Sequence, residues 1–347
     1  MGGCAGMLNF VTRTPSRRYP LPPMSEPAFS IIMPLYNHER YVTEAVRSVQ
    51  AQTYRHWELI ICDDGSKDRS GAIADELAAG DARITVIHQP NAGLPAARNA
   101  AIRVARNPWL ALLDSDDAFL PEALAHHAAT IAAAPGCLFT HGYYHRLTSD
   151  GAIEQRTGEQ QDRPTTPREL FSRMYLTPSC VAYHRQLIDR HGEYDMRLPT
   201  HEDYDFFLRV GRETAYVPVN RPVCLRRRHD TNISAQSGRT RTIEANVLHR
   251  FYTQYGGDRL VTPQQYDRRM ARLNYSAGRN YVQAGFHAQG IAALRRSLAL
   301  RPTGLKARCF LLWANALAWR GRHDDRIIPD FSPMPEALRF KGASVPT

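Results

Sequence analysis

Four short apolar runs, each ending in polar side chains, constrain most strongly how this chain of 347 residues can fold. Each run has the length and content of a strand that is buried on both faces of a parallel sheet. The runs are FSIIMPLY (Phe29–Tyr36), WELIICDDG (Trp57–Gly65), RITVIHQ (Arg83–Gln89) and WLALLD (Trp109–Asp114). The spacing between successive runs leaves room for one helix each time.

The segments between and after these runs have the apolar spacing of helices. Val42, Ala45, Val46 and Val49 fall on one helical face, and DRSGAIADELAA, LPAARNAAIRVA and PEALAHHAATIAAA are also helix-like. In the last of these, Pro121 occupies a first-turn position, which suits proline. Strands that alternate with helices predict an α/β fold, with a mostly parallel sheet covered on both faces.

Polar residues stand at or just beyond the carboxyl end of every predicted strand. In strand order they are Tyr36-Asn37, Asp63-Asp64, Asn91 and Asp114-Ser115-Asp116. Ligands of open α/β sheets bind beyond the carboxyl ends of the strands. The four clusters therefore predict one binding site at that edge of the sheet.

The last cluster places three carboxylates, Asp114, Asp116 and Asp117, within four positions. A strand end followed by a helix cap would explain a lone D-x-D. The alternative is a hard divalent cation, Mn²⁺ or Mg²⁺, which would relieve the repulsion by bridging carboxylate and phosphate oxygens. The chain has neither a G-x-G-x-x-G after the first strand nor a P-loop signature, so carboxylates and a metal would have to hold any bound nucleotide.

Other strand-end residues fit the same kind of ligand. Tyr36 could stack on a base, and Asp63 or Asp64 could accept hydrogen bonds from the base or ribose. Arg98, on the helix after the third strand, could reach the phosphates or could only pair with Asp64 or Asp114.

A second acidic motif lies in THEDYDFFLRVG, residues 200–211, where DYDFFLRV is helix-like. Glu202 and Asp203 stand at the amino end of this helix, where acids are favoured electrostatically. Helix capping alone would explain why both acids stand at this position. A carboxylate held there and facing a cleft also meets the requirements of a general base.

Taken together, these motifs resemble glycosyltransferase family 2, whose members are nucleotide-sugar-dependent enzymes of the GT-A fold. The resemblance covers residues 29–234. It rests on SIIMPLYNHERYVTEAVRSVQAQTYRHWELIICDDGSKDRS, NAGLPAARNAAI, LLDSDDAFLPEAL and EDYDFFLRV, in that order. It implies a GT-A, Rossmann-like sheet and an inverting transfer of a sugar to an acceptor hydroxyl.

For the donor side, the resemblance implies that Pro34, Tyr36 and Asp63 line the nucleoside pocket. Asp64 and Arg98 are implied to lie close to them. All five are therefore expected to be substrate-binding residues.

For the reacting centre, the resemblance implies that Asp114, Ser115 and Asp116 form the D-x-D motif at the donor. Asp114 and Asp116 would be metal ligands, with Asp116 the more direct one. Asp203 corresponds to the base that deprotonates the acceptor hydroxyl, and Glu202 beside it is expected to contact substrate.

Family members also carry a segment like RRRHDTNIS. By this match, Arg228, His229 and Ser234 would close over the diphosphate, and His229 would add a metal ligand. Arg226, the first of the three arginines, is explained equally well as surface charge.

The chain is expected to have three parts: a disordered arm or mis-assigned start (1–27), the GT-A domain (28–238) and a helical extension with a basic tail (239–347). In the extension, LNYSAGRNYVQAGFHAQGIAALRRSLALRPTGLKA resembles one tetratricopeptide-type hairpin. The residues that carry this likeness are Ala277, Tyr281, Gly285, Ala292 and Leu298. One repeat cannot form a solenoid alone, so it is expected to pack on the catalytic domain or on a partner.

The net charge of +10 resides in residues 268–347, which hold 14 Lys or Arg against 4 Asp or Glu. Such a tail suits an anionic membrane surface or an acidic partner, and equally a solvated helical face. Within it, LKARCFLLWANALAWRGRH is either a basic amphipathic helix on the membrane or an ordinary capping helix. Because the charge is not interleaved with aromatics on a recognisable module, nucleic acid is not expected as a partner.

The cellular location is expected to be cytoplasmic, either free or peripheral at the inner face of the cell membrane. The six cysteines are scattered, without a C-x-x-C pair, as in reduced proteins. No segment reaches the roughly 18 uninterrupted apolar residues of a membrane span.

The sequence therefore predicts a metal-dependent, inverting glycosyltransferase. We expect a nucleotide-sugar donor, with a UDP-sugar first, and as acceptor a surface glycan or its lipid-linked precursor. A transferase that uses polyprenyl phosphate is an alternative, although residues 140–199 offer a larger acceptor surface than that needs. A catalytically inactive sugar-nucleotide- or glycan-binding module, acting through the helical tail, is the alternative from another class.

Overall fold

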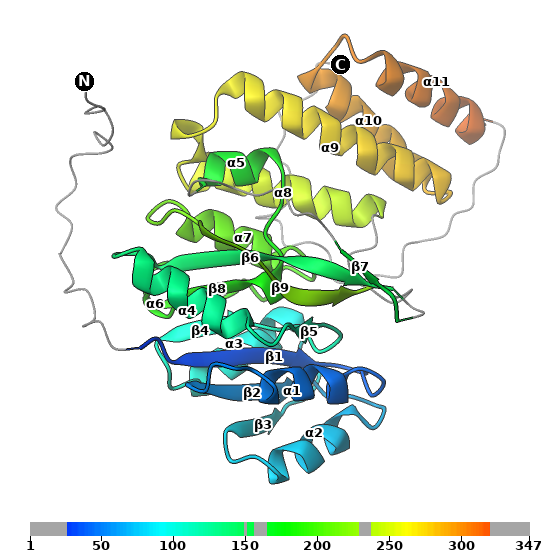
Figure 1. The fold of residues 1–347 in the computed structure, drawn as a ribbon. Coiled ribbons are helices and arrows are strands. Elements are labelled where there is room, and N and C mark those ends of the chain that lie inside the picture. Colours follow the sequence, from blue (N-terminus) through cyan, green and yellow to red (C-terminus); the bar gives the residue numbers. More distant parts are fainter. Residues whose placement is uncertain (1–25, 149–150, 156–164, 229–236, 320–347) are drawn as a thin grey trace, which may run out of the picture.

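The computed structural model describes residues 26–148, 151–155, 165–228 and 237–319. In this part of the chain, nine strands form one sheet. Helices flank the sheet, and the C-terminal helices stack on one another at one end of the molecule (Figure 1). None of the described helices is long and apolar enough to cross a membrane.

The first four strands form the parallel half of the sheet. They are β1 (Phe29–Leu35), β2 (Trp57–Asp63), β3 (Ile84–His88) and β4 (Trp109–Leu112). β1 pairs in parallel with β2 and with β4, and β2 pairs in parallel with β3. The four predicted strands are thus confirmed, and their carboxyl ends meet at one edge of the sheet.

The other half of the sheet corrects the expectation of a mostly parallel arrangement. It contains β5 (Ala118–Phe119), β6 (Phe139–Leu147), β7 (Ile153–Glu154), β8 (Val181–His184) and β9 (Val217–Arg227). β8 runs antiparallel to both β4 and β6, whereas β9 is parallel to β6 and antiparallel to β5. The order is β3-β2-β1-β4-β8-β6-β9-β5, with β7 on β6, so the sheet of this α/β fold is mixed.

Both faces of the parallel half are buried. Ile31 and Met33 of β1 point into one hydrophobic cluster, and Ile32 points into the other. The first cluster is completed by residues of α1 (Val42–Gln50), α2 (Ser70–Ala79) and α4 (Ala123–Ala133), and the second by residues of α3 (Leu94–Val104). A strand with two apolar neighbour layers needs apolar residues throughout, which explains the unbroken run in the sequence.

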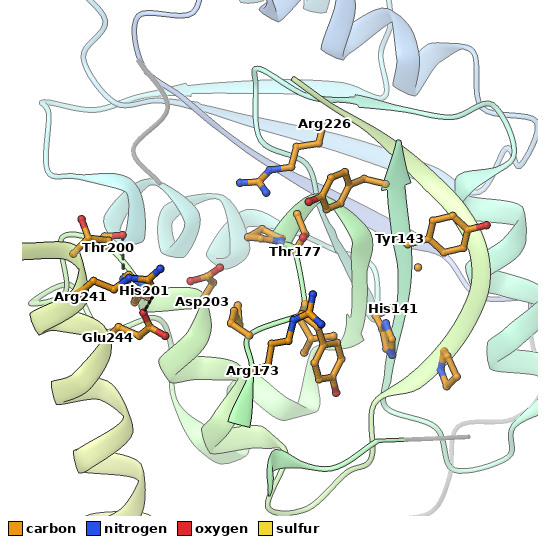
Figure 2. Close-up of a pocket in the computed structure, with 18 of the residues that line it drawn as sticks. His141, Tyr143, Arg173, Thr177, Thr200, His201, Asp203, Arg226, Arg241 and Glu244 are labelled. Atoms are coloured by element: carbon orange, nitrogen blue, oxygen red, sulfur yellow. Dashed lines mark hydrogen bonds and ion pairs between the residues drawn. The ribbon is translucent and has the colours of Figure 1, made fainter. Parts of the chain in front are cut away.

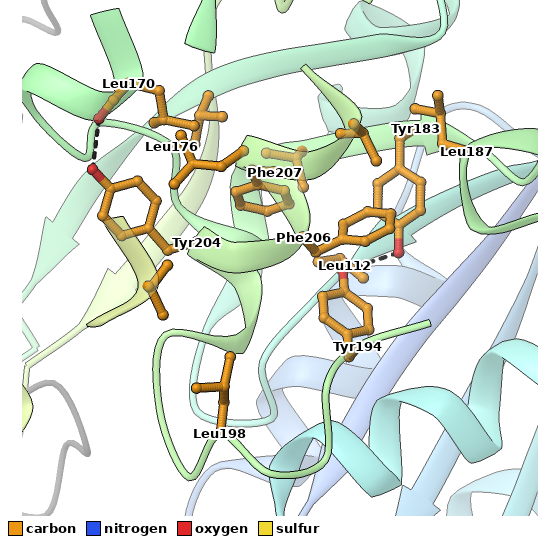
Figure 3. Close-up of a cluster of buried hydrophobic side chains, with 14 of the residues drawn as sticks. Leu112, Leu170, Leu176, Tyr183, Leu187, Tyr194, Leu198, Tyr204, Phe206 and Phe207 are labelled. Carbon is orange, nitrogen blue, oxygen red and sulfur yellow. Dashed lines mark hydrogen bonds between the residues drawn. The ribbon is translucent and has the colours of Figure 1, made fainter. Parts of the chain in front are cut away.

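The helix α7 (Glu202–Val210) is held by buried aromatic side chains (Figure 3). The Phe207 ring stands edge-on to Phe139 of β6, with 5.3 Å between ring centroids. The Tyr204 hydroxyl donates a hydrogen bond of 2.7 Å to the carbonyl oxygen of Leu170. Leu170 belongs to α5 (Pro167–Ser172), and α6 (Gln186–His191) also packs on α7. This packing fixes the amino end of α7 beside the carboxyl ends of the strands.

In the described residues after β9, the structure has four α-helices. They are α8 (Gly238–Gln254), α9 (Pro263–Gln283), α10 (His287–Leu300) and α11 (Leu305–Trp319). Arg250 of α8 donates to Asp205 of α7 and, over 2.6 Å, to Asp195. Because these groups are largely buried, the ion pairs anchor α8 firmly to the sheet domain.

The helices α9 and α10 form a hairpin with close backbones. A Cβ atom added to Gly290 of α10 would lie 3.0 Å from the carbonyl oxygen of Gly278 on α9. Glycine at both positions therefore permits the approach. The likeness of this hairpin to a tetratricopeptide repeat, and the domain boundaries at 27/28 and 238/239, stay predictions.

Candidate active site

A cavity of about 420 Å³ opens at the carboxyl ends of the parallel strands, and we call it the strand-end cavity. Side chains that are far apart in the sequence meet in its wall. The predicted site residues that line it are Pro34, Tyr36, Asp64, Arg98, Asp114, Ser115, Asp116, Glu202 and Asp203. Most of the predicted site is therefore brought together by the fold.

The two acids at the end of β2 differ in their surroundings. Asp64 lines the cavity and accepts hydrogen bonds of 2.8 Å from the backbone N–H groups of Ala92 and Gly93. Asp63 is not among the lining residues, because it faces His88, whose Nδ1 lies 3.0 Å from its carboxylate. Asp63 therefore supports the cavity wall through His88 and does not line the cavity itself.

The three clustered acids after β4 are separated by their partners. Asp114 accepts a hydrogen bond of 2.7 Å from Arg98. Asp117 is buried and accepts from the Ser179 hydroxyl over 2.6 Å and from the Arg227 backbone N–H over 3.0 Å. Burial, together with the nearby Asp116 and Asp114, raises the pKa of Asp117 well above its usual range. All three acids line the cavity, but Asp117 is held in the loop by Ser179 and by the Arg227 backbone N–H.

Arg98 is a buried cation that joins the two acidic motifs. Its side chain is only 1% exposed and donates to both Asp114 and Glu202. Burial lowers the pKa of the guanidinium, but the two carboxylates outweigh burial and raise the pKa above its ordinary value. The sequence suggested two possible partners for Arg98, Asp64 and Asp114. The structure confirms Asp114, and the second partner is Glu202 rather than Asp64.

The neighbouring acids of α7 have different environments. Glu202 is buried and paired with Arg98, and burial raises its pKa to about 7 although Arg98 pulls in the opposite direction. Asp203 is partly exposed, and its carboxylate accepts a hydrogen bond of 2.7 Å from the Tyr204 N–H. Among the described residues, no cation lies within ion-pair distance of Asp203. Of the two acids, Asp203 is the less buried one, whereas Glu202 is engaged with Arg98.

A second cavity of about 380 Å³ lies on the other side of Asp203, between β6, β9 and α8 (Figure 2). The residues shared by the two cavities are Pro178, Thr200, His201, Asp203 and Arg226. In the described part of the chain, Asp203 is the one carboxylate in both walls. His201, directly before α7, has a φ of 62°, the left-handed region that non-glycine residues rarely occupy.

Several residues that line the cavities were not assigned to the site from the sequence, His38 and Arg226 among them. His38 follows β1, lines the strand-end cavity, and has its Nδ1 2.8 Å from the Ser115 hydroxyl. Arg226 lines both cavities, and its guanidinium carbon lies 5.4 Å from the centroid of the Tyr144 ring. The reading of Arg226 as surface charge is therefore wrong, because β9 turns it inward.

The predicted closing segment is only partly described. Arg228 is exposed just after β9, where its N–H donates to the Leu147 carbonyl oxygen over 3.0 Å, and it does not line the strand-end cavity. His229 and Ser234 lie outside the described residues. Their predicted roles stay predictions.

The chemistry of the wall suits a divalent cation bound together with phosphate. The described residues contain no group of three or more metal-binding side chains. Mg²⁺ and Mn²⁺, however, are commonly held by one or two carboxylates with substrate phosphates completing the shell. Asp114 and Asp116 share the cavity and offer hard oxygen ligands of this kind, although one Asp114 oxygen already accepts from Arg98.

The sequence matches the model of the family described as glycosyl transferase family 2 over residues 30–192. The chain is 32% identical over 188 residues to an uncharacterized glycosyltransferase of Haemophilus influenzae, and the match covers 53% of the chain and 72% of that protein. Two further bacterial relatives match over shorter stretches, which span only 26% and 29% of their own lengths.

Solved structures share the fold at low sequence identity. Residues 1–349 of S. aureus TarS, in complex with UDP-GlcNAc, superpose with a TM-score of 0.55 at 16% identity, covering 85% of this chain and 92% of that one. The mannosyltransferase PcManGT from Pyrobaculum calidifontis, in complex with GDP-Man and Mn²⁺, gives a TM-score of 0.52 at 18% identity, covering 87% and 84%. Both likenesses establish the GT-A-type fold.

Proposed function

Because the chain belongs to glycosyltransferase family 2 and is a glycosyltransferase, we propose how its two cavities divide the reaction. A nucleotide-sugar occupies the strand-end cavity, and the acceptor hydroxyl enters the second cavity. Asp203 takes the proton from that hydroxyl as it attacks the anomeric carbon. The attack comes from the face opposite the leaving diphosphate, so the configuration inverts.

The observation that carries this proposal is the position of Asp203 between the two cavities. A general base must contact the acceptor hydroxyl in the second cavity while that hydroxyl reaches the anomeric carbon of the donor in the strand-end cavity. The base must therefore lie in the wall that the two cavities share. The neighbouring Glu202 is excluded from this role by its burial and its ion pair with Arg98. A base of this kind typically contributes roughly 10²- to 10⁴-fold to the rate.

On the donor side, Asp114 and Asp116 would hold Mn²⁺ or Mg²⁺. A bound divalent cation would stabilise the negative charge that develops on the leaving diphosphate. Arg226, which also lines this cavity, would add a second positive charge near the phosphates. Asp64, Pro34 and Tyr36 would contact the nucleoside. The nucleoside would therefore lie at the carboxyl ends of β1 and β2.

The donor we propose is a UDP-sugar. The support is that the chain shares its fold with a protein solved with UDP-GlcNAc. The related fold solved with GDP-Man makes a GDP-sugar the alternative.

The acceptor we propose is a surface glycan or its lipid-linked precursor, met by a cytoplasmic protein at the inner face of the membrane. The support comes from α11, whose exposed apolar residues lie beside basic ones. Leu312 is 72% exposed and Trp319 is 88% exposed, and Lys306 and Arg308 on the same helix are exposed as well. A helix with apolar and basic residues on its surface suits an anionic bilayer interface.

A nucleotide panel tests the proposed donor site. Thermal unfolding is measured with UDP, GDP, dTDP and CMP, each with and without Mn²⁺. We expect UDP with Mn²⁺ to raise the melting temperature, since a ligand at 100 times its Kd adds about 2.7 kcal/mol of stability. Asp116→Ala should abolish the Mn²⁺-dependent part, whereas Asp189→Ala, at an exposed acid of α6, should keep it.

If no nucleotide raises the melting temperature, the donor site is wrongly assigned. The alternative of a glycan-binding module acting through its helical extension would then be favoured. A shift with GDP alone would keep the site and change the donor class.

A further inference from the structure

The helix α8 lies beyond residue 192, where the match to the family model ends, but it lines the second cavity and is tied to α7. We propose that Arg250 of α8 is a positioning residue for sugar transfer. Through Asp205, it holds the first turn of α7 so that Asp203 stays in the wall between the two cavities. This role rests on the proposed function, in which Asp203 is the base, and it adds to that function a residue that lines neither cavity.

Asp203 lies within the first turn of α7, and a backbone hydrogen bond closes that turn. The N–H of Asp205 donates to the carbonyl oxygen of His201 over 3.0 Å. In an α-helix such a bond reaches back four residues, so Asp203 lies inside the ring that the bond closes. His201 has a φ of 62°, and a non-glycine residue keeps such a backbone only where its surroundings hold it. A group that fixes Asp205 therefore also fixes the turn that carries Asp203.

The carboxylate of Asp205 is buried and has a cation at each oxygen. Its side chain is 2% exposed. Oδ2 accepts a hydrogen bond of 2.8 Å from Arg209, one turn further along α7, and Oδ1 accepts from Arg250 of α8. Arg209 also donates to the carbonyl oxygen of Glu193 over 2.8 Å, so it ties α7 to the segment that follows α6. Arg250 instead ties the first turn of α7 to α8.

Arg250 joins three parts of the chain with one side chain. It is 5% exposed and donates to Asp205 of α7 and, over 2.6 Å, to Asp195. Hydrogen bonds between ionised groups are short and strong. The planar guanidinium can hold two carboxylates in fixed directions, whereas the ammonium of a lysine is a point charge on a flexible chain. Substitution by lysine therefore keeps the charge and loses the fixed geometry.

The helix α8 is itself held from its other side, because it lies between α7 and α9 (Figure 1). Glu244 of α8 is buried and accepts a hydrogen bond of 2.6 Å from Arg269 of α9. Glu244 also lines the second cavity (Figure 2). One helix therefore carries part of the proposed acceptor wall and, through Arg250, fixes the base beside that wall.

The position of Asp203 matters because a general base must lie within hydrogen-bond reach of the proton that it removes. A displacement of about 1 Å, even from a substitution far from the chemistry, can lower a rate about 10²-fold. Loosening of α7 should therefore lower the turnover number. Donor binding should remain, because the proposed nucleoside and metal contacts lie at the ends of β1, β2 and β4. A merely structural role of Arg250 would lower stability and leave the turnover number of the folded molecules unchanged.

The test compares substitutions of Arg250 in the full chain, at a temperature well below its melting temperature. Turnover is measured as release of the nucleoside diphosphate from saturating UDP-GlcNAc, UDP-glucose or GDP-Man, with methyl glucoside and with water as acceptors. We expect Arg250→Met to lower the turnover number about 10- to 100-fold without changing the donor Kd. Arg250→Lys should restore part of the turnover, because it returns the charge but not the geometry.

Asp205→Asn breaks the same link from the side of α7. It leaves Arg250 paired with Asp195, so it tests the role even if Arg250→Met does not fold. Its turnover number should also fall. Combining Asp205→Asn with Arg250→Lys should lower the turnover number little further, because both substitutions act on one interaction.

Glu58→Gln is the matched control for a lost buried charge. The Glu58 side chain is 8% exposed and accepts a hydrogen bond of 2.8 Å from Arg106. It lies near the start of β2 and lines neither cavity. Glu58→Gln should therefore lower stability and keep the turnover number.

Hydrogen exchange gives a readout that needs no substrate. The backbone N–H groups of α7 should exchange faster in Asp205→Asn and in Arg250→Lys than in the unaltered chain, because a local contact of that helix is lost. Glu58→Gln should leave the exchange of α7 relative to the other helices unchanged.

A lower turnover number with unchanged donor Kd and faster exchange in α7 supports the positioning role. An unchanged turnover number in Asp205→Asn, unchanged exchange of α7, or an equal loss of turnover in Glu58→Gln would overturn it. Those results would leave Asp203 as the base, provided that Asp203→Asn loses transfer. Absence of donor binding or of turnover with all three donors, or transfer at the unaltered rate by Asp203→Asn, would count against the proposed function itself.

Discussion

At the scale of single residues, the site is organised by which acid has which partner. The sequence predicts that Asp114, Asp116 and Asp117 lie together, and the structure confirms that they do. The sequence could not predict the different surroundings of the three acids, because their hydrogen-bond partners come from distant segments. Arg98 is on α3, and Ser179 lies 62 positions after Asp117.

Arg226 is a residue whose place in the site the sequence did not indicate. Three consecutive arginines after an apolar run look like surface charge, and the residues around them offer no further signal. Only the pairing of β9 with β6 shows that Arg226 faces inward, over the Tyr144 ring. The alternation of side chains along a predicted strand would have been the available clue, had β9 been recognised.

The buried Arg98 makes a strong prediction about stability. Arg98→Met would leave Asp114 and Glu202 without their shared cation, and breaking a buried ion pair from one side costs about 3–5 kcal/mol. Urea unfolding should show this loss as a lower midpoint.

The control for Arg98 is Arg103→Met on the same helix. Arg103 is 59% exposed and pairs with Glu193, so the expected cost is only about 0–1 kcal/mol. Equal destabilisation by the two substitutions would show that Arg98 does not bridge the acidic motifs.

At the scale of elements, the sequence predicted the four parallel strands β1 to β4 and missed the strands of the mixed half of the sheet. β1 to β4 are buried on both faces and therefore read as unbroken apolar runs. β6 (FTHGYYHRL) and β9 (VPVNRPVCLRR) are only partly buried and contain glycine, prolines, histidines or arginines. Four of them, His141, Gly142, Pro218 and Arg226, line the second cavity, so part of what obscures these strands in the sequence belongs to the site.

The helix α11 is the element whose surface suggests a membrane contact. We expect the chain to co-sediment with vesicles that contain phosphatidylserine and not with neutral vesicles, because both apolar contact and charge attraction are needed. Replacing Leu312 and Trp313 together by serine should weaken this binding, and high salt should weaken it as well.

Ala316→Ser, at an exposed position of the same helix, is the control for α11. It changes the surface polarity little and should leave sedimentation unchanged. If the doubly substituted chain binds vesicles as well as the unaltered one, α11 is not the contact and the membrane proposal fails at this element.

At the scale of the whole molecule, the candidate active site lies where the two halves of one sheet meet. The parallel half carries the strand-end cavity, and the mixed half with α8 carries the second cavity. α7 lies between them and presents Asp203 to both. The family resemblance predicted the fold and the order of the motifs, but the second cavity depends on contacts between β6, β9 and α8 that no local pattern in the sequence indicates.

The role of Asp203 as the base is tested by measuring donor binding and sugar transfer separately in Asp203→Asn. With the nucleotide-sugar identified by the nucleotide panel, one measures the donor Kd and the turnover number of the variant, with Asp189→Asn as the exposed control. We expect an unchanged Kd and a turnover number lower by roughly 10²- to 10⁴-fold, the contribution of a general base. Transfer at the unaltered rate in Asp203→Asn would contradict this role.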